Sequence, residues 1–310
     1  MRAALPLLAL LLSACPPSDG VTPDDKDADD TGDTVEGRTF EDFVNVTTPW
    51  VGNTDECIAG KVQNVDPSCI ADITVNGRID DFQSEDPVPD ATVQLWVSDS
   101  IEGAADETTV SDGDGNFVLE AAQSCTPIAY GTSTPPEWEE TKDTYEVHQV
   151  FGYAAGGASD EVFNSVSDTT SKLIPSLIGV EWDQSTGIIA GTAYDCDVNP
   201  VEYAQVFIHD GSGGIPTTGD VFYFSESGGT SLPTSLDSQP HTNTNGLWVA
   251  VNIPSGTWTA EMWGFDGTDY VLMGATVLEI AAGSVNISNI YTGISDGIWY
   301  PGSCLAACAG

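Results

Sequence analysis

Cysteines are the residues of this 310-residue chain whose chemistry is easiest to predict from type and spacing. One of the seven, Cys15, lies near the start and is discussed below. The other six are Cys57, Cys69, Cys125, Cys196, Cys304 and Cys308. An even number of cysteines in an exported chain indicates disulfide bonds. No C-x-x-C pair or neighbouring histidine supports a zinc site instead. Many pairings are possible, and we guess the nearest ones, Cys57–Cys69 and Cys304–Cys308.

Common hydrolase motifs do not organise the polar residues into an active site. No H-E-x-x-H zinc motif occurs. His148, His209 and His241 are far apart in sequence, and none is followed three residues later by the glutamate of an H-x-x-E zinc pair. Carboxylates are so abundant that any pair chosen as the acid and base of a glycosidase would be arbitrary. We therefore predict that the chain is not an enzyme, and we assign no catalytic and no metal-binding residue.

The N-terminus has the pattern of a bacterial export signal. Arg2 supplies a positive charge, residues 3–12 are almost all apolar, and two small residues precede Cys15. Such a run is typical of a secretory signal and is too short to span a bilayer. Leu12-Ser13-Ala14-Cys15 resembles the lipobox of bacterial lipoproteins. The resemblance implies cleavage after residue 14 and acylation of Cys15 by palmitate-type chains.

The same resemblance implies a location in the cell envelope. Several acyl chains on one residue give stable attachment to a membrane, which is then the first partner of the protein. Pro16 and Pro17 follow the cysteine, and no aspartate stands next to it. In lipoproteins this pattern implies sorting to the outer membrane, on its periplasmic or surface-exposed face. The alternative is a plain secreted protein in which Cys15 carries no lipid.

The mature chain is strongly acidic. Removing residues 1–14 leaves 48 acidic and 6 basic residues, a net charge of 6 − 48 = −42. Such a surface repels phosphate groups, so we exclude nucleic acids as partners. Residues 15–39 are rich in Pro, Gly and Asp and poor in apolar residues. We predict that this segment is a disordered, self-repelling tether between the membrane and a folded part.

Calcium is the one cofactor for which part of a motif exists. Asp25, Asp27, Asp29 and Glu36 have the spacing of some EF-hand ligands, but the required glycine is missing. Residues 112–116 also place oxygen-bearing side chains at alternate positions. An Asp-rich tether and a hairpin turn explain these two patterns. We therefore predict no cofactor, with structural calcium as the alternative.

The composition of residues 40–310 favours an all-β fold. Gly, Thr, Ser, Val and aromatic residues dominate, and strong helix formers are few. The predicted segments are a signal peptide (1–14), a tether (15–39), an N-terminal extension (40–71), a first β-sandwich (72–155), a linker with one short helix (156–186), a second β-sandwich (187–292) and a cysteine-containing tail (293–310).

An internal repeat is the basis for predicting two β domains. The motif P-V-x-x-A-x-V occurs at residues 87–93 and again at residues 200–206. A strand-like segment with a glycine precedes each copy, and a turn with Asn-Gly or Asp-Gly character follows, before an apolar strand. Alternation places Ala91, Val93, Leu95 and Val97 on one strand face, and Ala204, Val206 and Ile208 on another.

This order of elements resembles the carboxypeptidase regulatory-like domain, a transthyretin-like β-sandwich. The family typically has a strand with glycine, then P-V-x-x-A-x-V, then a D-G-x-F turn, then an aromatic-rich hairpin. The resemblance covers roughly residues 72–152 and 187–292, and it implies two tandem seven-stranded transthyretin-like or Ig-like sandwiches. The second copy departs from the pattern by an insertion at about 210–240, which is either a binding loop or simply a tolerated one.

One short helix is predicted between the sandwiches. Val162, Val166, Ile174 and Ile178 have the spacing of one helix face, and Pro175 would kink or end the helix. We expect this helix to pack against the sandwiches rather than to bind a partner.

Two tryptophans are the speculative ligand-binding residues. Trp96 has the opposite parity to Val93 and Leu95, and Trp258 the opposite parity to Trp263, so outward-facing rings are possible. Outward rings on a sandwich can stack on sugars, whereas burial against a neighbouring element is the favoured alternative. We predict a non-catalytic envelope lipoprotein that is a structural or interaction module for an envelope protein. The alternatives are binding of an envelope polysaccharide and, less favoured, an enzyme of unfamiliar type.

Overall fold

The computed structural model describes residues 46–52, 55–58, 63–82, 84–134, 142–155, 157–211, 220–225, 231–294, 297–305 and 308. Cys15, the tether and the EF-hand-like aspartates lie outside the described residues. The described chain is mostly β, with one helix of ten residues, α2 (Asp168–Leu177), and short helical turns. No described helix is long and apolar enough to cross a membrane.

The first β-sandwich is built from seven strands in two sheets. In one sheet β1 (Asp72–Asp81) lies between antiparallel β4 (Asn116–Gln123) and parallel β7 (Ala158–Ser165). The other sheet has the order β3 (Glu107–Val110), β2 (Thr92–Trp96), β5 (Pro127–Ser133), β6 (Asp143–Val150). Leu95, Leu119, Tyr130 and Phe163 belong to the core of this sandwich.

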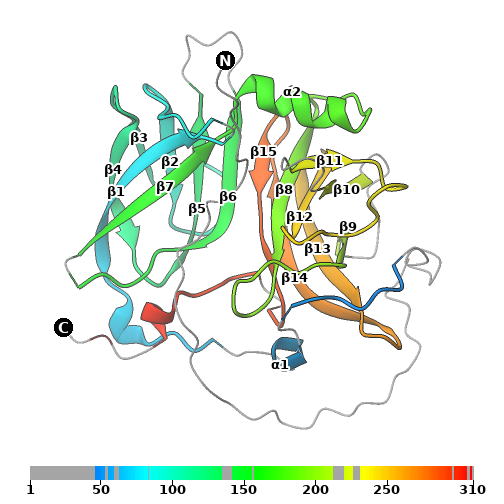
Figure 1. Ribbon diagram of the computed structural model, residues 1–310. Helices are drawn as coiled ribbons and strands as arrows, with labels where there is room; N and C mark the ends of the chain where they lie inside the picture. Colours follow the sequence, from blue (N-terminus) through cyan, green and yellow to red (C-terminus); the bar gives the residue numbers. More distant parts are fainter. Residues whose placement is uncertain are drawn as a thin grey trace, which may run out of the picture.

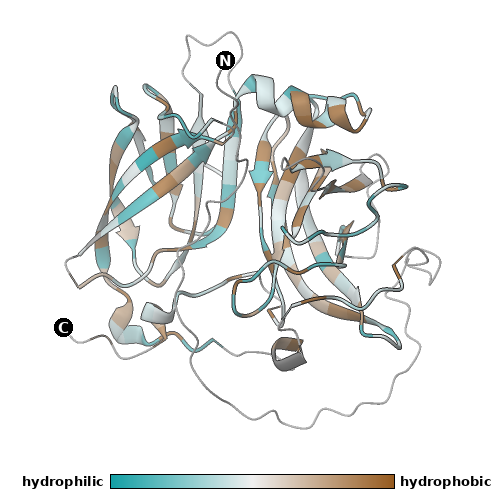
Figure 2. Cartoon of the chain, viewed as in Figure 1, coloured by the Kyte–Doolittle hydropathy of each residue, from teal (hydrophilic) through white to brown (hydrophobic). Residues whose placement is uncertain are grey.

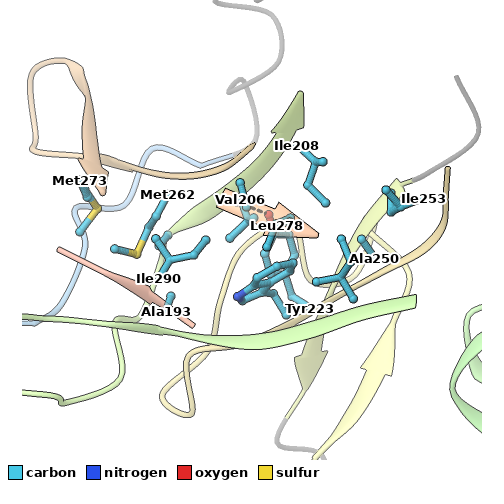
Figure 3. Close-up of a cluster of buried hydrophobic side chains, with 14 of the residues drawn as sticks. Ala193, Val206, Ile208, Tyr223, Ala250, Ile253, Met262, Met273, Leu278 and Ile290 are labelled. Atoms are coloured by element: carbon cyan, nitrogen blue, oxygen red, sulfur yellow. Dashed lines mark hydrogen bonds between the residues drawn. The ribbon is translucent and has the colours of Figure 1, made fainter. Parts of the chain in front are cut away.

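The second β-sandwich repeats this plan with additions. In one sheet β8 (Thr186–Tyr194) lies between antiparallel β12 (Leu247–Pro254) and parallel β15 (Val285–Ile287) and β16 (Ile290–Tyr291). The facing sheet contains β9 (Gln205–His209), β13 (Gly256–Phe265) and β14 (Tyr270–Ile280). Figure 3 shows Val206 and Ile208 of β9 gathered with Tyr223 and Leu278 in the core between them.

The P-V-x-x-A-x-V motif folds in the same way in both copies. Asp90 and Tyr203 hold the same motif position, and both have positive φ, 57° and 65°. Such a turn sets the following strand so that its alternate residues face the core. Ala91, Val93 and Leu95 are buried in the first core, and Ala204, Val206 and Ile208 in the second. Val97 does not join them, because β2 ends at Trp96, and Val97 is 40% exposed.

The predicted linker at 156–186 begins too early. Residues 158–165 form β7, which pairs with β1 over eight residue positions, so they complete the first sandwich. Helix α2 begins only at Asp168, after Ser167 caps it by accepting a hydrogen bond from the Thr170 amide. Pro175 lies inside the helix, and the helix ends two residues later. Val162 and Phe163 therefore have strand alternation rather than helix periodicity: Val162 is exposed and Phe163 is buried.

Part of the insertion at 210–240 extends the second sandwich. It contributes β10 (Asp220–Ser225) and β11 (Leu232–Thr234), which add to the sheet beyond β12. Phe222 and Phe224 join a third cluster of buried residues, together with Val249 and Val166, on the outer face of that sheet. Ile174 of α2 and Ile178, the residue that caps the helix at its C-terminus, pack against this cluster. The helix therefore covers a sheet face, as expected, and lies across the top of the view in Figure 1.

The two sandwiches share one sheet. β15 pairs in parallel with β8 of its own sandwich and with β6 of the first, so that Val285 lies opposite both Ile188 and Thr144. The result is a continuous ten-stranded sheet that runs through both sandwiches. Figure 1 shows the sandwiches side by side with β15 between them, and Figure 2 shows apolar and polar residues mixed along their strands.

Candidate functional site: the junction of the two sandwiches

All six cysteines of the folded part form disulfide bonds, as predicted from their even number. The pairs are Cys57–Cys196, Cys69–Cys308 and Cys125–Cys304, with Cα–Cα separations of 5.5, 5.1 and 5.4 Å. The guessed pairs of sequence neighbours are wrong. Cys57 and Cys69 lie at different sandwiches, because the chain crosses from the second to the first between them. Cys304 and Cys308 both lie in one cluster with Cys69 and Cys125 of the first sandwich, and each is bonded to one of those two rather than to its sequence neighbour.

The N-terminal segment is bound to the second sandwich. The Trp50 amide donates to the Phe265 carbonyl at 3.2 Å, and the Tyr270 hydroxyl donates to the Val46 carbonyl at 2.9 Å. Trp50 also packs against the second core. Cys57 then bonds to Cys196, just after β8. We call residues 46–58 the N-terminal strap.

The C-terminal segment returns to the first sandwich. The Cys304 carbonyl accepts from the Asp66 amide at 2.9 Å, and Cys304 is bonded to Cys125 between β4 and β5. Cys308 is bonded to Cys69, just before β1. We call residues 297–308 the C-terminal strap. The N-terminal strap is thus fixed to the second sandwich, and the C-terminal strap is fixed to the first (Figure 1).

A loop of the first sandwich docks on a strand of the second. The Glu279 carboxylate on β14 accepts hydrogen bonds from the Ser100 hydroxyl at 3.0 Å and from the Ile101 amide at 2.7 Å. These residues belong to the loop 97–106 between β2 and β3. The contact adds a polar interface to the shared sheet and the two straps.

His148 joins the same interface from β6. Its Nδ1 lies 2.7 Å from an Asp99 carboxylate oxygen, and its Nε2 lies 2.8 Å from the Val277 carbonyl oxygen on β14. Burial lowers the pKa of His148, but the hydrogen bond to Asp99 and the Asp99 charge outweigh it, so that the pKa is raised above its usual value. The folded junction therefore favours the protonated ring.

A buried carboxyl group lies two residues earlier on β6. Glu146 is 2% exposed, and its strand pairs with β15 at Ile287. Burial raises the pKa of Glu146 to about 7, although hydrogen bonds from the Tyr130 and Asn164 side chains act in the opposite direction. One carboxyl oxygen of Glu146 has no hydrogen-bond partner among the described residues. This group also favours the protonated form in the folded protein.

The structure does not support Trp96 as a ligand-binding residue. As its parity indicates, Trp96 lies on the face of β2 opposite the core, but it is only 4% exposed. It packs with Ala129 and Val147, and Ile101 and Ala105 of the loop 97–106 lie against this cluster. The prediction from parity that Trp96 faces away from the core is correct. The loop 97–106 then buries the ring, which strand parity alone does not show.

Trp258, unlike Trp96, lies on the core side of its strand. It is half-buried against the second core, and its indole nitrogen donates to the Pro254 carbonyl at 2.8 Å. The opposite face of β13 carries Trp263, whose indole nitrogen donates to Glu261 at 2.9 Å. The two tryptophans do differ in parity, but it is Trp263 that faces away from the core.

The calcium-like spacing at residues 112–116 is accounted for by turn geometry. One Asp112 carboxylate oxygen accepts from the backbone amides of Asp114 and Asn116, both at 2.9 Å. Asp195 in the second copy does the same with the amides of Asp197 and Asn199. Each carboxylate therefore organises its own tight turn, between two strands that belong to different sheets. Within the described ranges, no group of three His, Cys, Asp or Glu side chains could hold a metal ion.

Residues 293–297 read G-I-S-D-G, so one common hydrolase pattern, G-x-S-x-G, does occur in the sequence. In hydrolases this pattern lies between a strand and a helix, with the serine at the sharp turn. Here it follows the two-residue strand β16, and the described residues after Gly297 lead to a three-residue turn of 3-10 helix. The strand-turn-helix context of a nucleophile is thus not formed by the described residues, and Ser295 lies outside them.

No family model matches this sequence, and no curated protein matches it. Solved structures with weak similarity include the Bacillus anthracis TIE protein, with 12% identity over 74% of this chain and a TM-score of 0.21. The chain spans about a third of that protein, 34% of its length. The shaft pilin SpaA from Lactobacillus rhamnosus GG matches over 74% of this chain and 99% of its own, with 11% identity and a TM-score of 0.21. BcpA, the major pilin subunit of Bacillus cereus, matches over 72% and 99%, with 10% identity and a TM-score of 0.22.

The disulfide bonds of the chain indicate the compartment in which it folds. Stable disulfides form in oxidising compartments and are rare in the bacterial cytoplasm. Three disulfides that close long stretches of this chain are therefore typical of a protein that folds outside the cytoplasm. What the structure describes is a mostly β, disulfide-bonded, extracytoplasmic architecture.

Proposed function

We propose that the protein is a non-catalytic interaction module of the bacterial cell envelope, held to a membrane by lipid on Cys15 through the tether at 15–39. The observation that carries the proposal is the junction. A continuous ten-stranded sheet and two crossed straps hold both sandwiches in one fixed arrangement. Such a body presents its surfaces at constant relative positions, which suits docking of an assembly partner better than enclosing a substrate.

An envelope protein is the favoured partner. Of the two rings proposed for sugar stacking, Trp96 is buried and Trp258 is half-buried, so they give polysaccharide binding little support. The acidic surface argues against phosphate-rich partners. The transthyretin-like resemblance of the repeat is consistent with a display module and remains part of the proposal.

The proposal is tested by crosslinking the native lipoprotein in cells, followed by affinity capture and analysis for protein and glycan. A recurring envelope protein in near-equal amounts supports the interaction module. Two variants serve as controls: Cys15→Ala removes the lipid attachment, and the double variant Cys125→Ser/Cys304→Ser loosens the C-terminal strap but leaves the anchor intact. We expect the first to leave the membrane fraction and the second to remain there but to capture less partner.

Capture of polysaccharide without a recurring protein would contradict this proposal and restore the carbohydrate alternative. Membrane retention of the Cys15→Ala variant would contradict the anchor alone.

A further inference from the structure

The ring of His148 has two hydrogen-bond acceptors and belongs to an interface between the sandwiches. Nδ1 faces the Asp99 carboxylate of the first sandwich, and Nε2 faces the Val277 carbonyl of the second. A neutral imidazole carries one N–H and one lone pair, whereas imidazolium carries two N–H groups. Only the protonated ring can donate to both acceptors at once. In the neutral ring a lone pair would face one of the two oxygens.

His209 gives a contrasting arrangement within the same protein. Its Nε2 faces the Glu261 carboxylate at 2.8 Å, while its Nδ1 accepts a hydrogen bond from the Gly211 amide at 3.1 Å. One acceptor and one donor are satisfied by the neutral ring. The requirement for a second proton is therefore a property of the site around His148 and not of buried histidines in general.

The backbone aims His148 at the second sandwich. The register of β5 and β6 shifts between Ile128 and Tyr130, which is opposite this part of β6. His148 has φ 61° and Asp99 has φ 55°, and the Asp99 carboxylate also accepts from the His148 amide at 2.6 Å. Such conformations cost free energy and persist when the surrounding contacts fix them. The bulge thus replaces regular pairing with a side chain directed across the interface.

The groups that surround the ring favour its positive charge. Asp99 comes from the loop 97–106, and Glu279 comes from β14, where it accepts from Ser100 and Ile101 of the same loop. Both are acids, one from each sandwich. Deprotonation of His148 would weaken the contact to Val277 or to Asp99 and remove the attraction to both carboxylates.

We propose that protonated His148 is a latch that locks the loop 97–106 of the first sandwich onto β14 of the second. Loss of the proton releases this contact, while β15 and the disulfides keep the sandwiches joined. The direction of the pH dependence follows from the linkage between proton binding and folding. Because the pKa in the folded state is raised, the stabilisation is complete below the unfolded pKa of His148 and is lost as pH rises through the folded pKa. The inference concerns the junction itself and holds whether or not the chain is anchored to a membrane.

The test uses the mature lipoprotein in detergent micelles, labelled with 15N only at its three histidines. NMR titration gives the pKa of each ring, and hydrogen–deuterium exchange gives the protection of residues 97–106 and 275–280 between about pH 6 and about pH 9. We expect His148 to titrate above 6.5 and the protection, corrected for intrinsic exchange, to fall roughly three- to tenfold in step with it. A Glu146→Gln background removes the carboxyl group of β6 whose pKa is raised to about 7 and which would titrate within the same pH range.

His148→Asn keeps a residue type that tolerates positive φ, and it should abolish the pH-dependent step. The matched variant His209→Asn should retain the step. Asp99→Asn provides a second route if His148→Asn folds poorly, since it should lower both the His148 pKa and the midpoint of the exchange step. The proposal is overturned by a His148 pKa at or below 6.5, or by protection that does not follow the His148 titration in the parent and in Asp99→Asn.

Discussion

Ser111 and Thr242 make the same pair of hydrogen bonds in the two sandwiches. The Ser111 hydroxyl accepts from the Ala91 amide at 3.0 Å and donates to the Val88 carbonyl at 2.8 Å. The Thr242 hydroxyl accepts from the Ala204 amide at 2.9 Å and donates to the Val201 carbonyl at 2.7 Å. Each hydroxyl closes the turn of one P-V-x-x-A-x-V motif, so the repeat extends beyond the residues of the motif itself.

Removing either hydroxyl should destabilise its sandwich. In Ser111→Ala and Thr242→Val, one buried amide and one buried carbonyl lose their partner, which costs about 1–3 kcal/mol. Chemical denaturation of the oxidised protein measures the change. Thr108→Val, on the exposed side of β3, is the control and should change the free energy of unfolding by less than about 0.5 kcal/mol. Equal effects of all three variants would show that these hydroxyls have no special role.

The disulfide pairing leads to a second prediction. Peptide mapping without reduction should recover Cys57 linked to Cys196, Cys69 to Cys308 and Cys125 to Cys304. The double variants Cys57→Ser/Cys196→Ser and Cys125→Ser/Cys304→Ser should each lose about 2–5 kcal/mol of unfolding free energy, because each bond closes a long loop. Hydrogen exchange should increase in the N-terminal strap for the first variant and in the C-terminal strap for the second. Recovery of Cys57 linked to Cys69 would contradict the arrangement.

Glu146 makes stability dependent on pH. Its pKa is about 7 in the folded protein, against an ordinary value of 4.5. The protonated carboxyl therefore stabilises the fold fully below about pH 4.5, and this contribution is lost as pH rises to about 7. Glu146→Gln should be close to neutral at about pH 4.5 and should stabilise at about pH 8.5, by on the order of a few kcal/mol. Denaturation at both pH values tests this, with the exposed Glu120→Gln as control. A gain of equal size at both pH values would contradict the role of the carboxyl.

Two equivalent glycines should respond differently to a methyl group. Gly77 and Gly191 lie opposite Phe117 and Trp248 in their β1–β4 and β8–β12 pairs. A methyl at Gly77 would overlap the ring of Phe117, whereas at Gly191 it would overlap the Ser288 backbone carbonyl. Both Gly→Ala variants should lower the melting temperature. Adding Phe117→Leu should partly rescue Gly77→Ala, whereas Trp248→Leu should not rescue Gly191→Ala, because backbone cannot move aside as a side chain can.

The sequence predicts most of the repeat because the relevant information is local. Alternation of Ala91, Val93 and Leu95 follows from strand geometry, and the turn before them follows from the Pro and Asp of the motif. The same rules fail two residues after Leu95, at Val97, where the end of the strand rather than the alternation decides the exposure of the side chain.

The junction could not be predicted because it depends on contacts between distant parts of the chain. Nothing in residues 158–165 distinguishes a strand from a helix until parallel pairing with β1 is known. Trp96 has the parity of an exposed residue and is buried by a loop, and Cys57 finds its partner 139 residues away. His148 shows no motif in the sequence, since its two acceptors lie on the loop after β2 and on β14.

The order of the disulfides along the chain decides how the protein would carry mechanical tension. Suppose that the chain is pulled at residues before Cys57 and at residues beyond Cys308. The shortest covalent route between these points runs from Cys57 along the chain to Cys69 and then directly through sulfur to Cys308. Every strand from β1 to β16 lies outside that route. Tension would therefore bypass both sandwiches, and they could stay folded under a pull that would unravel the same sequence in its reduced form.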